Sequence, residues 1–274
     1  MQSSLLEFQQ INYTYLGGQQ LALKGLTLKV PAKKKCALIG HNGCGKTTLF
    51  LLANGLYKPQ TGVISWQGKP LQYDRKSLIA LRQKVGLIFQ DPEQQLVAAT
   101  VEEDISYGLC NLGLPAAEIK QRVEQTLVEF GLTELAQRPV HHLSLGQKKR
   151  VSIADVMVLK PELLLLDEPT AYLDQLHSRN LMTTLQKIHQ QGTTILMATH
   201  DLDLVYRWAD WVFVMDQGQL ILEGKPDDVF AQKHILASLQ IEVPVIYEML
   251  LTAANAEERV ILERLHQKIS HVFG

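Results

Sequence analysis

The sequence contains few cysteines and no long apolar run, and each shortage excludes a class of protein. Only three of the 274 residues are cysteines, Cys36, Cys44 and Cys110, and their spacing shows no pairs. An odd, unpaired set argues against a disulfide framework and favours the reducing cytosol. No stretch approaches the roughly 18 consecutive apolar residues that a membrane-spanning helix needs. Any role at a membrane would therefore be peripheral and would depend on a partner.

The chain also lacks an excess of either charge. Its 27 basic and 28 acidic residues give a formal net charge of −1, so the composition indicates no basic face for nucleic acid. The first ten residues, MQSSLLEFQQ, have neither the basic start nor the apolar core of a signal peptide. An apolar content of 46% is enough for a real core. We expect a globular protein with no nucleic acid partner.

Strand-like and helical patterns alternate along most of the chain. Two β-like runs flank Gly17 and Gly18, and residues 62–71 form a second expected hairpin. The runs KCALIG, VGLIFQ, ELLLLD and TTILMATH indicate buried strands, and helical patterns separate several of them. Strands that alternate with helices predict an α/β fold, in which a mainly parallel sheet carries helices on both faces.

Two segments depart from this alternation. Between about residues 97 and 145 the pattern is mostly helical, which indicates an inserted helical sub-domain. The apolar positions that repeat there at helical spacing are Ile119, Val123, Leu127 and Phe130. A later stripe, which packs either into the core or against a second copy, follows the capping pair Asn255 and Glu258 and consists of Ile261, Leu265, Ile269 and Val272. We expect one domain over residues 1–232 and a helical C-terminal extension over residues 233–274.

The stretch GHNGCGKTT, residues 40–48, matches G-x-x-x-x-G-K-[ST] between an expected strand and an expected helix. Glycines let the backbone N–H groups point at phosphate oxygens, and the helix adds its positive end. Lys46 can reach the β- and γ-phosphates, and Thr47 offers a hydroxyl to Mg²⁺. Cys44 is either a small loop filler or a reactive thiol near a helix N-terminus. The predicted nucleotide-binding residues are Gly40, His41, Asn42, Gly43, Cys44, Gly45, Lys46, Thr47 and Thr48.

Two further strands end in polar groups. The run ELLLLDEPT carries Asp167 to the C-terminal end of a strand, where open α/β sheets bind ligands. Asp167 can hold Mg²⁺ directly or through water, and Glu168 can polarise the attacking water. The run VGLIFQDPEQQL ends in the amide of Gln90 and then places Asp91 and Glu93 on a proline-broken turn. The amide suits a small polar ligand, whereas the acids suit a basic partner.

The run LSLGQKKR, residues 143–150, lies upstream of LLLLDEPTAYLD and MATHD. Together with the phosphate loop, and in this order, these motifs resemble the nucleotide-binding domain of ABC transporters over about residues 4–232. The resemblance implies a P-loop NTPase fold with a RecA-like core, an antiparallel β sub-domain and an inserted α-helical sub-domain. It also implies ATP hydrolysis with ATP and Mg²⁺ as cofactors. The chain departs from the pattern at Leu145, where glycine is usual, and at PAKKKCALIG, which lacks the usual Gly-Glu before the strand.

The resemblance also implies roles for single residues. Tyr15 would stack on adenine, His200 would be the switch histidine, and Gln90 would sense Mg²⁺ or the attacking water. Catalysis would then involve Glu168, His200 and Gln90, and Mg²⁺ would be held by Thr47, Gln90 and Asp167. The residues that would act across a dimer interface are Ser144, Gly146, Gln147 and Asp174.

The residues themselves favour such a dimer. Ser144 and Gly146 at a helix N-terminus form a second anion site, made of backbone donors and a hydroxyl. One chain does not need two phosphate sites for a single nucleotide. A head-to-tail dimer, with each nucleotide between one phosphate loop and the other chain's signature (the segment around Ser144 and Gly146), resolves this. A heterodimer stays possible, but one complete motif set permits two equivalent sites, so we favour a homodimer.

The stretch ISWQGKPLQYDRKSLIALRQKVGLIFQDPEQQ is more specific. It is similar to the ATPases of energy-coupling factor (ECF) importers, in their cobalt/nickel branch. That resemblance implies an integral membrane coupling subunit bound through Asp91 and Glu93, and indirectly a small membrane substrate-binding component. Glu102, Glu103 and Asp104 would face the same basic coupling helices, unless the acidic turn is merely solvated.

We therefore expect an ATPase at the cytoplasmic face of the membrane that powers import of cobalt or nickel. An ECF ATPase for a vitamin or another micronutrient is one alternative. A soluble ABC-type ATPase that acts on nucleic acid is the other, although this chain has no basic patch and no heptad insert.

Overall fold

The computed structural model describes residues 4–252. The predicted capping pair at Asn255 and the apolar stripe that begins at Ile261 lie outside these residues. Within the described range, no helix is both long and apolar enough to cross a bilayer.

The central layer is a six-stranded sheet whose order is β10-β9-β3-β8-β7-β6. Neighbouring strands from β9 to β6 run parallel, and β10 runs antiparallel to β9, so the predicted mainly parallel sheet is confirmed. The strands are β3 (Lys35–Ile39), β6 (Val85–Ile88), β7 (Leu163–Asp167), β8 (Thr194–Ala198), β9 (Trp211–Asp216) and β10 (Gln219–Gly224).

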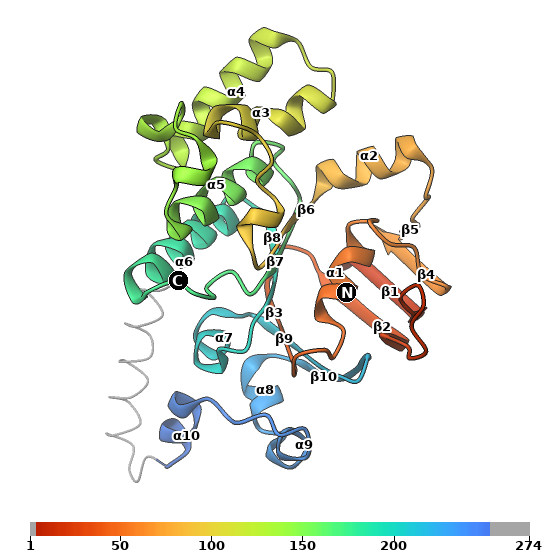
Figure 1. Ribbon diagram of the computed structural model, residues 1–274. Coiled ribbons are helices and arrows are strands. Elements are labelled where there is room, and N and C mark those ends of the chain that lie inside the picture. The colour runs from red at the N-terminus through yellow and green to blue at the C-terminus, as the bar shows by residue number, and fades with distance from the viewer. Residues whose placement is uncertain (1–3, 253–274) are drawn as a thin grey trace.

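A second, antiparallel sheet lies beside the central one. Its order is β2-β1-β4-β5, and both predicted hairpins of the N-terminal third are present in it. The strands are β1 (Ser4–Tyr13), β2 (Leu23–Pro31), β4 (Thr61–Trp66) and β5 (Lys69–Pro70). Helix α1 (Lys46–Ala53) lies against this sheet, on the right-hand side of Figure 1.

The alternation of side chains along each central strand explains how the layers hold together. In β7, Leu163 and Leu165 pack with α1 and the antiparallel sheet, whereas Leu164 and Leu166 pack with helices on the opposite face. All four leucines are fully buried, and burial of each such side chain contributes about 1.5–3 kcal/mol. A strand apolar on both faces therefore needs a layer on each side.

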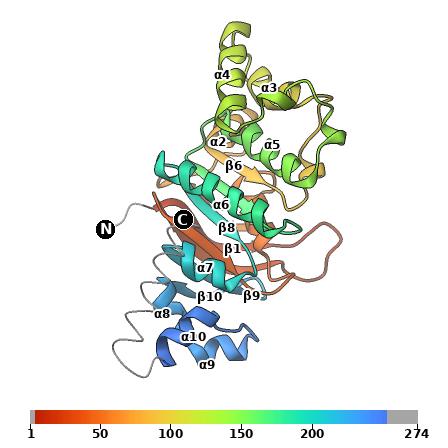
Figure 2. The same ribbon diagram turned by 90° about the vertical axis from the view of Figure 1, so that its left-hand side faces the viewer.

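Helices pack around the central sheet, and the predicted helical insertion is present. Figure 1 shows α3, α4 and α5 together above the strands, and Figure 2 shows α6 and α7 over the face turned to the viewer. The helices are α2 (Arg75–Lys84), α3 (Val101–Asn111), α4 (Ala116–Glu129), α5 (Leu145–Met157), α6 (Gln175–Gln190) and α7 (Leu202–Trp208). Short 3-10 turns cover Pro92–Gln94, Thr133–Leu135 and Val140–His142.

The last described helices pack on the edge of the core near β9 and α7. They are α8 (Pro226–Phe230), α9 (Lys233–Ser238) and α10 (Val245–Thr252). The ring of Tyr247 in α10 lies edge-on to Tyr206 in α7, with 5.5 Å between ring centroids, and tilts against Phe230. Leu236 and Ile241 join the same apolar cluster. This segment is thus attached to the core through buried apolar contacts.

Candidate nucleotide site

Four segments that carry predicted site residues follow parallel strands of the central sheet. The phosphate loop follows β3, Gln90 follows β6, Glu168 follows β7 and His200 follows β8. Because the carboxyl ends of parallel strands meet at one edge, these residues converge. One detail differs from expectation: β6 ends at Ile88, so Gln90 lies in the loop rather than at the strand tip.

The phosphate loop has the backbone that its glycines predict. Gly45 adopts φ +108° directly before α1, and Gly40 adopts φ +147°. A Cβ atom on Gly40 would lie 2.2 Å from the carbonyl oxygen of Met215, and one on Gly45 would lie 2.8 Å from that of Ala22. Both positions therefore require glycine. The predicted strand–loop–helix context is confirmed.

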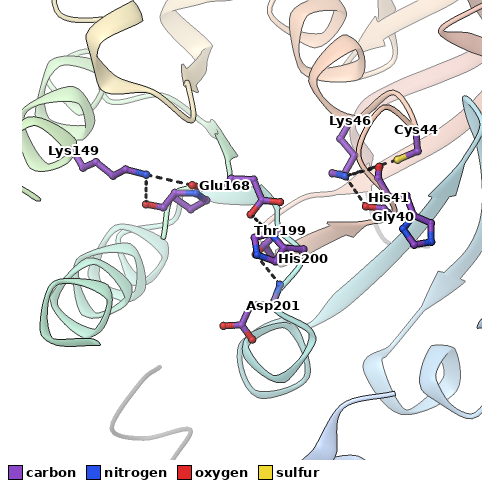
Figure 3. A network of polar contacts seen from close by, with 10 residues as sticks. Gly40, His41, Cys44, Lys46, Lys149, Glu168, Thr199, His200 and Asp201 are labelled. Atoms are coloured by element: carbon purple, nitrogen blue, oxygen red, sulfur yellow. Dashed lines mark hydrogen bonds and ion pairs between the residues drawn. The ribbon is translucent and has the colours of Figure 1, made fainter. Parts of the chain in front are cut away.

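Lys46 lies across its own loop. Its Nζ donates hydrogen bonds to the carbonyl oxygens of Gly40, at 2.6 Å, and His41, at 3.1 Å (Figure 3). Cys44 is buried beside it, and burial raises the pKa of the Cys44 thiol. A buried thiol with a raised pKa is a poor nucleophile, so the structure favours the loop-filler interpretation of Cys44.

Thr47 and Asp167 bring two oxygen ligands together beside the loop. The Thr47 hydroxyl donates to Oδ2 of Asp167 at 2.6 Å. Burial, with a further contribution from the charge of Glu168, raises the pKa of Asp167, while the Thr47 hydrogen bond and Lys46 act in the opposite direction. A hydroxyl next to a buried carboxylate is the kind of donor set that Mg²⁺ binds in nucleotide sites.

Glu168 is buried at the end of β7 in an unusual backbone conformation. Its φ is +44°, and its N–H donates to the Ala198 carbonyl at 2.9 Å. Oε2 lies 2.9 Å from Nδ1 of His200, and Figure 3 shows the two side chains facing each other. Both carboxylate oxygens are buried, and neither makes a hydrogen bond within residues 4–252. The carboxylate therefore retains an oxygen that can accept a proton from a small ligand such as water.

One cavity joins four of the predicted residues, although Lys46, Thr47 and Asp167 are not part of its lining. It has a volume of about 910 Å³, and Asn42, Gln90, Glu168 and His200 all line it. Polar groups from the phosphate loop and from three other strand ends thus meet at a single solvent-filled space. Its remaining polar lining includes Thr170, Tyr172, Gln175, Ser178, Arg179, Asp201 and Arg207.

Tyr15 lies in a cluster of three tyrosines next to the phosphate-loop helix. Its ring is edge-on to Tyr13 and Tyr57, and its hydroxyl lies 2.8 Å from Oγ1 of Thr48. Tyr15 as a whole residue is 41% exposed, so its aromatic side chain is open to a flat ligand. The sequence did not single out Tyr57, which is stacked on Tyr13.

The predicted signature lies elsewhere. Ser144 caps α5: its Oγ accepts from the Gln147 N–H at 3.3 Å, and the Gln147 side chain accepts from the Ser144 N–H at 2.9 Å. Ser144 and Gly146 do not line the cavity that holds Glu168. Gly146 instead borders a separate cavity together with His177. The His177 ring is hydrogen-bonded to the carboxylate of Asp174, which precedes α6.

The structure adds two contacts that sequence reasoning missed. Lys149 is buried and reaches the backbone after β7, and the side chain of His41 bonds the carbonyl of Leu239 beyond α9. A signal for Lys149 exists, since it lies four residues before the buried Ile153 on the same face of α5. No local pattern predicts the His41 contact, because its partner is 198 positions away.

The acids after Gln90 differ from one another. The side chain of Glu93 is 67% exposed, as predicted, but pairs with Lys148 at 2.5 Å. The prediction that Asp104 faces a partner is wrong. Asp104 is buried, and its Oδ1 accepts from the N–H groups of Val97 and Ala98 at 2.8 Å, because the loop before α3 needs those donors satisfied.

A phosphate loop at one strand end, with an aspartate and a glutamate at another, defines the class of P-loop ATPases. Sequence comparison narrows the class. Residues 23–171 match the model of the family "ABC transporter". The chain is 69% identical over 273 residues, 100% of both chains, to alr3946 of Nostoc sp. (strain PCC 7120), whose name as an ABC transporter ATP-binding protein is provisional. It is 42% identical over 247 residues to the energy-coupling factor transporter ATP-binding protein EcfA2 of Clostridium perfringens (strain SM101), covering 90% of this chain and 86% of that relative.

Comparison with solved structures points to the same family. For cbiO1 of Clostridium perfringens, part of the ABC transporter complex cbiONQ, the TM-score is 0.76 at 42% identity, over 90% of this chain and 99% of that one. The ATP-binding cassette MJ0796, in a dimeric post-hydrolysis state with ADP and Pi, gives 0.73 at 26% identity, over 81% of this chain and 98% of that one. The chain belongs to the ABC transporter family, as an ATP-hydrolysing subunit of the ECF type.

Proposed function

We propose that Glu168 activates the water that attacks ATP, and that hydrolysis powers import of cobalt or nickel through an ECF-type complex. The catalytic part rests on one observation, the buried Oε1 of Glu168 without a hydrogen-bond partner within residues 4–252. A buried carboxylate oxygen left unpaired costs free energy unless a ligand or water uses it. An attacking water that bonds Oε1 supplies the missing partner.

The neighbouring side chains support this role. Nδ1 of His200 lies 2.9 Å from Oε2, close enough to pair with the carboxylate, and Gln90 borders the same cavity. Lys46 can turn from its loop carbonyls to the phosphates when nucleotide binds, because its stem is flexible. Negative charge that develops on the γ-phosphate is then neutralised by donors already in place.

Mg²⁺ fits the residues present. Thr47 and Asp167 would hold it, with Gln90 as the third ligand, and it would neutralise charge on the phosphates when bound. The fit rests on the 2.6 Å contact between the Thr47 hydroxyl and the Asp167 carboxylate, and on the buried position of that carboxylate. Burial raises the pKa of Asp167, and a cation at this place would favour the ionised form of its carboxylate.

The subunit acts as a head-to-tail homodimer in this proposal. Ser144 borders no part of the cavity around Glu168, yet it caps a helix whose first N–H groups suit an anion. Ser144 of the partner subunit would then complete each nucleotide site, with Asp174 in the contact loop. Because one chain carries both halves, two copies give two equivalent sites.

The dimer lies at the cytoplasmic face of the membrane, bound to an integral coupling subunit. Asp91 and Glu93 support this contact, because both are exposed on the loop that also carries Gln90. A basic coupling segment would compete with Lys148 for Glu93. We also propose that residues 1–232 form the ATPase domain and residues 233–274 an appended helical extension.

The choice of cobalt or nickel rests on the stretch from Ile64 to Gln95, which is similar to the cobalt/nickel branch. The test is uptake by vesicles that contain the complex assembled with its membrane subunits, with labelled cobalt, labelled nickel or a labelled vitamin. We expect ATP-dependent uptake of one metal, and none with Glu168→Gln as the matched control. Uptake of a vitamin but of neither metal would overturn the cargo and leave the ATPase intact.

A further inference from the structure

Lys149 is a buried cation on the helix that begins at the signature. Lys149 is only 5% exposed, and it lies in α5, five positions after the capping residue Ser144. A buried ammonium group is costly unless hydrogen bonds compensate for the lost water. Its place in the core therefore depends on the partners that it meets there.

Those partners are two carbonyl oxygens directly after β7. The Nζ atom of Lys149 donates to the carbonyl of Pro169 at 2.8 Å and to that of Glu168 at 3.3 Å (Figure 3). The Glu168 carbonyl also accepts from the Ala171 N–H at 3.1 Å. The chain segment that follows the strand is thus held from α5.

The segment that Lys149 holds contains an unusual backbone conformation at Glu168. Glu168 adopts φ +44°, a left-handed conformation that non-glycine residues rarely adopt. Its N–H is fixed by Ala198 on one side, and its carbonyl by Lys149 on the other. Burial lowers the pKa of Lys149 to about 8, and the negative charges of Glu168 and Asp91 act in the opposite direction. The direction of the Glu168 side chain follows from this clamped backbone.

We infer that Lys149 is a positioning residue for the Glu168 of its own chain, although its helix presents the signature to the other nucleotide of the dimer. The inference rests on the proposed function, which makes Glu168 catalytic and pairs the chains head to tail. It assigns to one helix two tasks at two different sites. Its N-terminus serves the partner's nucleotide, and Lys149 serves the nucleotide on its own phosphate loop.

The first test uses homodimers. Lys149→Met keeps an unbranched side chain of similar length but removes the donors. We expect kcat to fall by about 10- to 100-fold, as for a misplaced catalytic group, while KM for ATP stays within about twofold. Lys149→Arg should restore most of the activity, because it keeps donors and charge. Lys120→Met, which removes an exposed lysine of α4, is the control and should behave as the wild type.

Two results would overturn the inference: an unchanged kcat in Lys149→Met, or a parallel loss of ATP binding that Lys149→Arg does not rescue. If Lys149→Met does not fold, Lys149→Gln takes its place, since it keeps a donor group. Glu168→Gln is measured alongside. If Glu168→Gln hydrolyses ATP normally, the proposed function fails. If only Glu168→Gln is impaired, the inference about Lys149 fails alone.

The second test separates positioning of Glu168 from mere support of the signature helix. In a mixture of Ser144→Arg and Lys46→Ala chains, the one intact site uses the Glu168 of the Ser144→Arg chain. Lys149→Met added to that chain should lower the recovered activity by about 10- to 100-fold, and added to the Lys46→Ala chain should not lower it further. Equal loss from either chain would contradict the inference. If the parent mixture recovers nothing, the pairing is wrong, and the homodimer test still decides on Lys149.

Discussion

The phosphate loop and the signature segment both lead into the N-terminus of a helix, yet the chain surrounds them differently. Around the phosphate loop, Lys46 is buried and Thr47 bonds the carboxylate of Asp167 from another strand. Around the signature, Ser144 is exposed and makes its hydrogen bonds with its own helix, to Gln147. The first site thus brings distant parts of one chain together around the phosphate loop, whereas the Ser144 cap is made within its own helix. This difference suits the proposed dimer, in which the partner subunit would bring the nucleotide to the signature.

The largest effect is expected from a substitution in the first of these two regions, the site around the phosphate loop. Glu168→Gln keeps the shape and the hydrogen-bonding capacity of the side chain but removes the charge that organises water. We expect hydrolysis to fall by roughly 100-fold or more, as for loss of a general base, with ATP binding retained. The variant should accumulate as an ATP-bound dimer, which gel filtration with and without ATP would detect. Hydrolysis near the wild-type rate would show that another carboxylate is catalytic.

A smaller effect is expected at Glu93, which connects the two regions by its ion pair to Lys148 beside the signature. Glu93→Lys should leave ATP binding by the isolated chain unchanged and weaken assembly with the coupling subunit by about 10-fold. A pull-down of that subunit at graded concentrations measures the change. An exposed ion pair contributes little by itself, so the folded chain should tolerate its loss.

Lys148→Met is the matched variant for this experiment, because it breaks the same ion pair but keeps the acid. If Glu93 binds the coupling subunit, assembly survives in Lys148→Met and weakens in Glu93→Lys. If both variants assemble like the wild type, the acidic turn is only solvated. Loss of ATP binding in Glu93→Lys would mean that this acid faces the nucleotide.

The local features of the fold were predictable because each depends on neighbours in the sequence. The phosphate loop follows from glycines that accept positive φ, and the start of α5 follows from the Ser144 and Gln147 capping pair. The four consecutive leucines of β7 predict a strand buried on both faces, since an apolar run this short is typical of a buried strand and too short for a helix. These features were read correctly from spacing and residue type.

The long-range features were not predictable in this way. Asp104 looked like a surface acid, but the loop at Val97 and Ala98 needs its carboxylate as an acceptor. Lys149 carries only the weak signal of its spacing to Ile153, because the carbonyls that it binds become neighbours only after β7 is in place. Burial of a charged group is decided by the whole fold, and a sequence pattern records it only weakly.

The pairing of chains is the central claim, and mixing two inactive variants tests it most directly. Ser144→Arg blocks the signature and Lys46→Ala disables the phosphate loop, so each homodimer should be inactive. In an equal mixture, a head-to-tail dimer of the two carries one doubly defective site and one intact site. We predict recovery of up to about a quarter of the wild-type ATPase activity, because about half of randomly formed dimers are mixed and each has one working site. No recovery, with mixed dimers demonstrated by differently tagged chains, would contradict the claim.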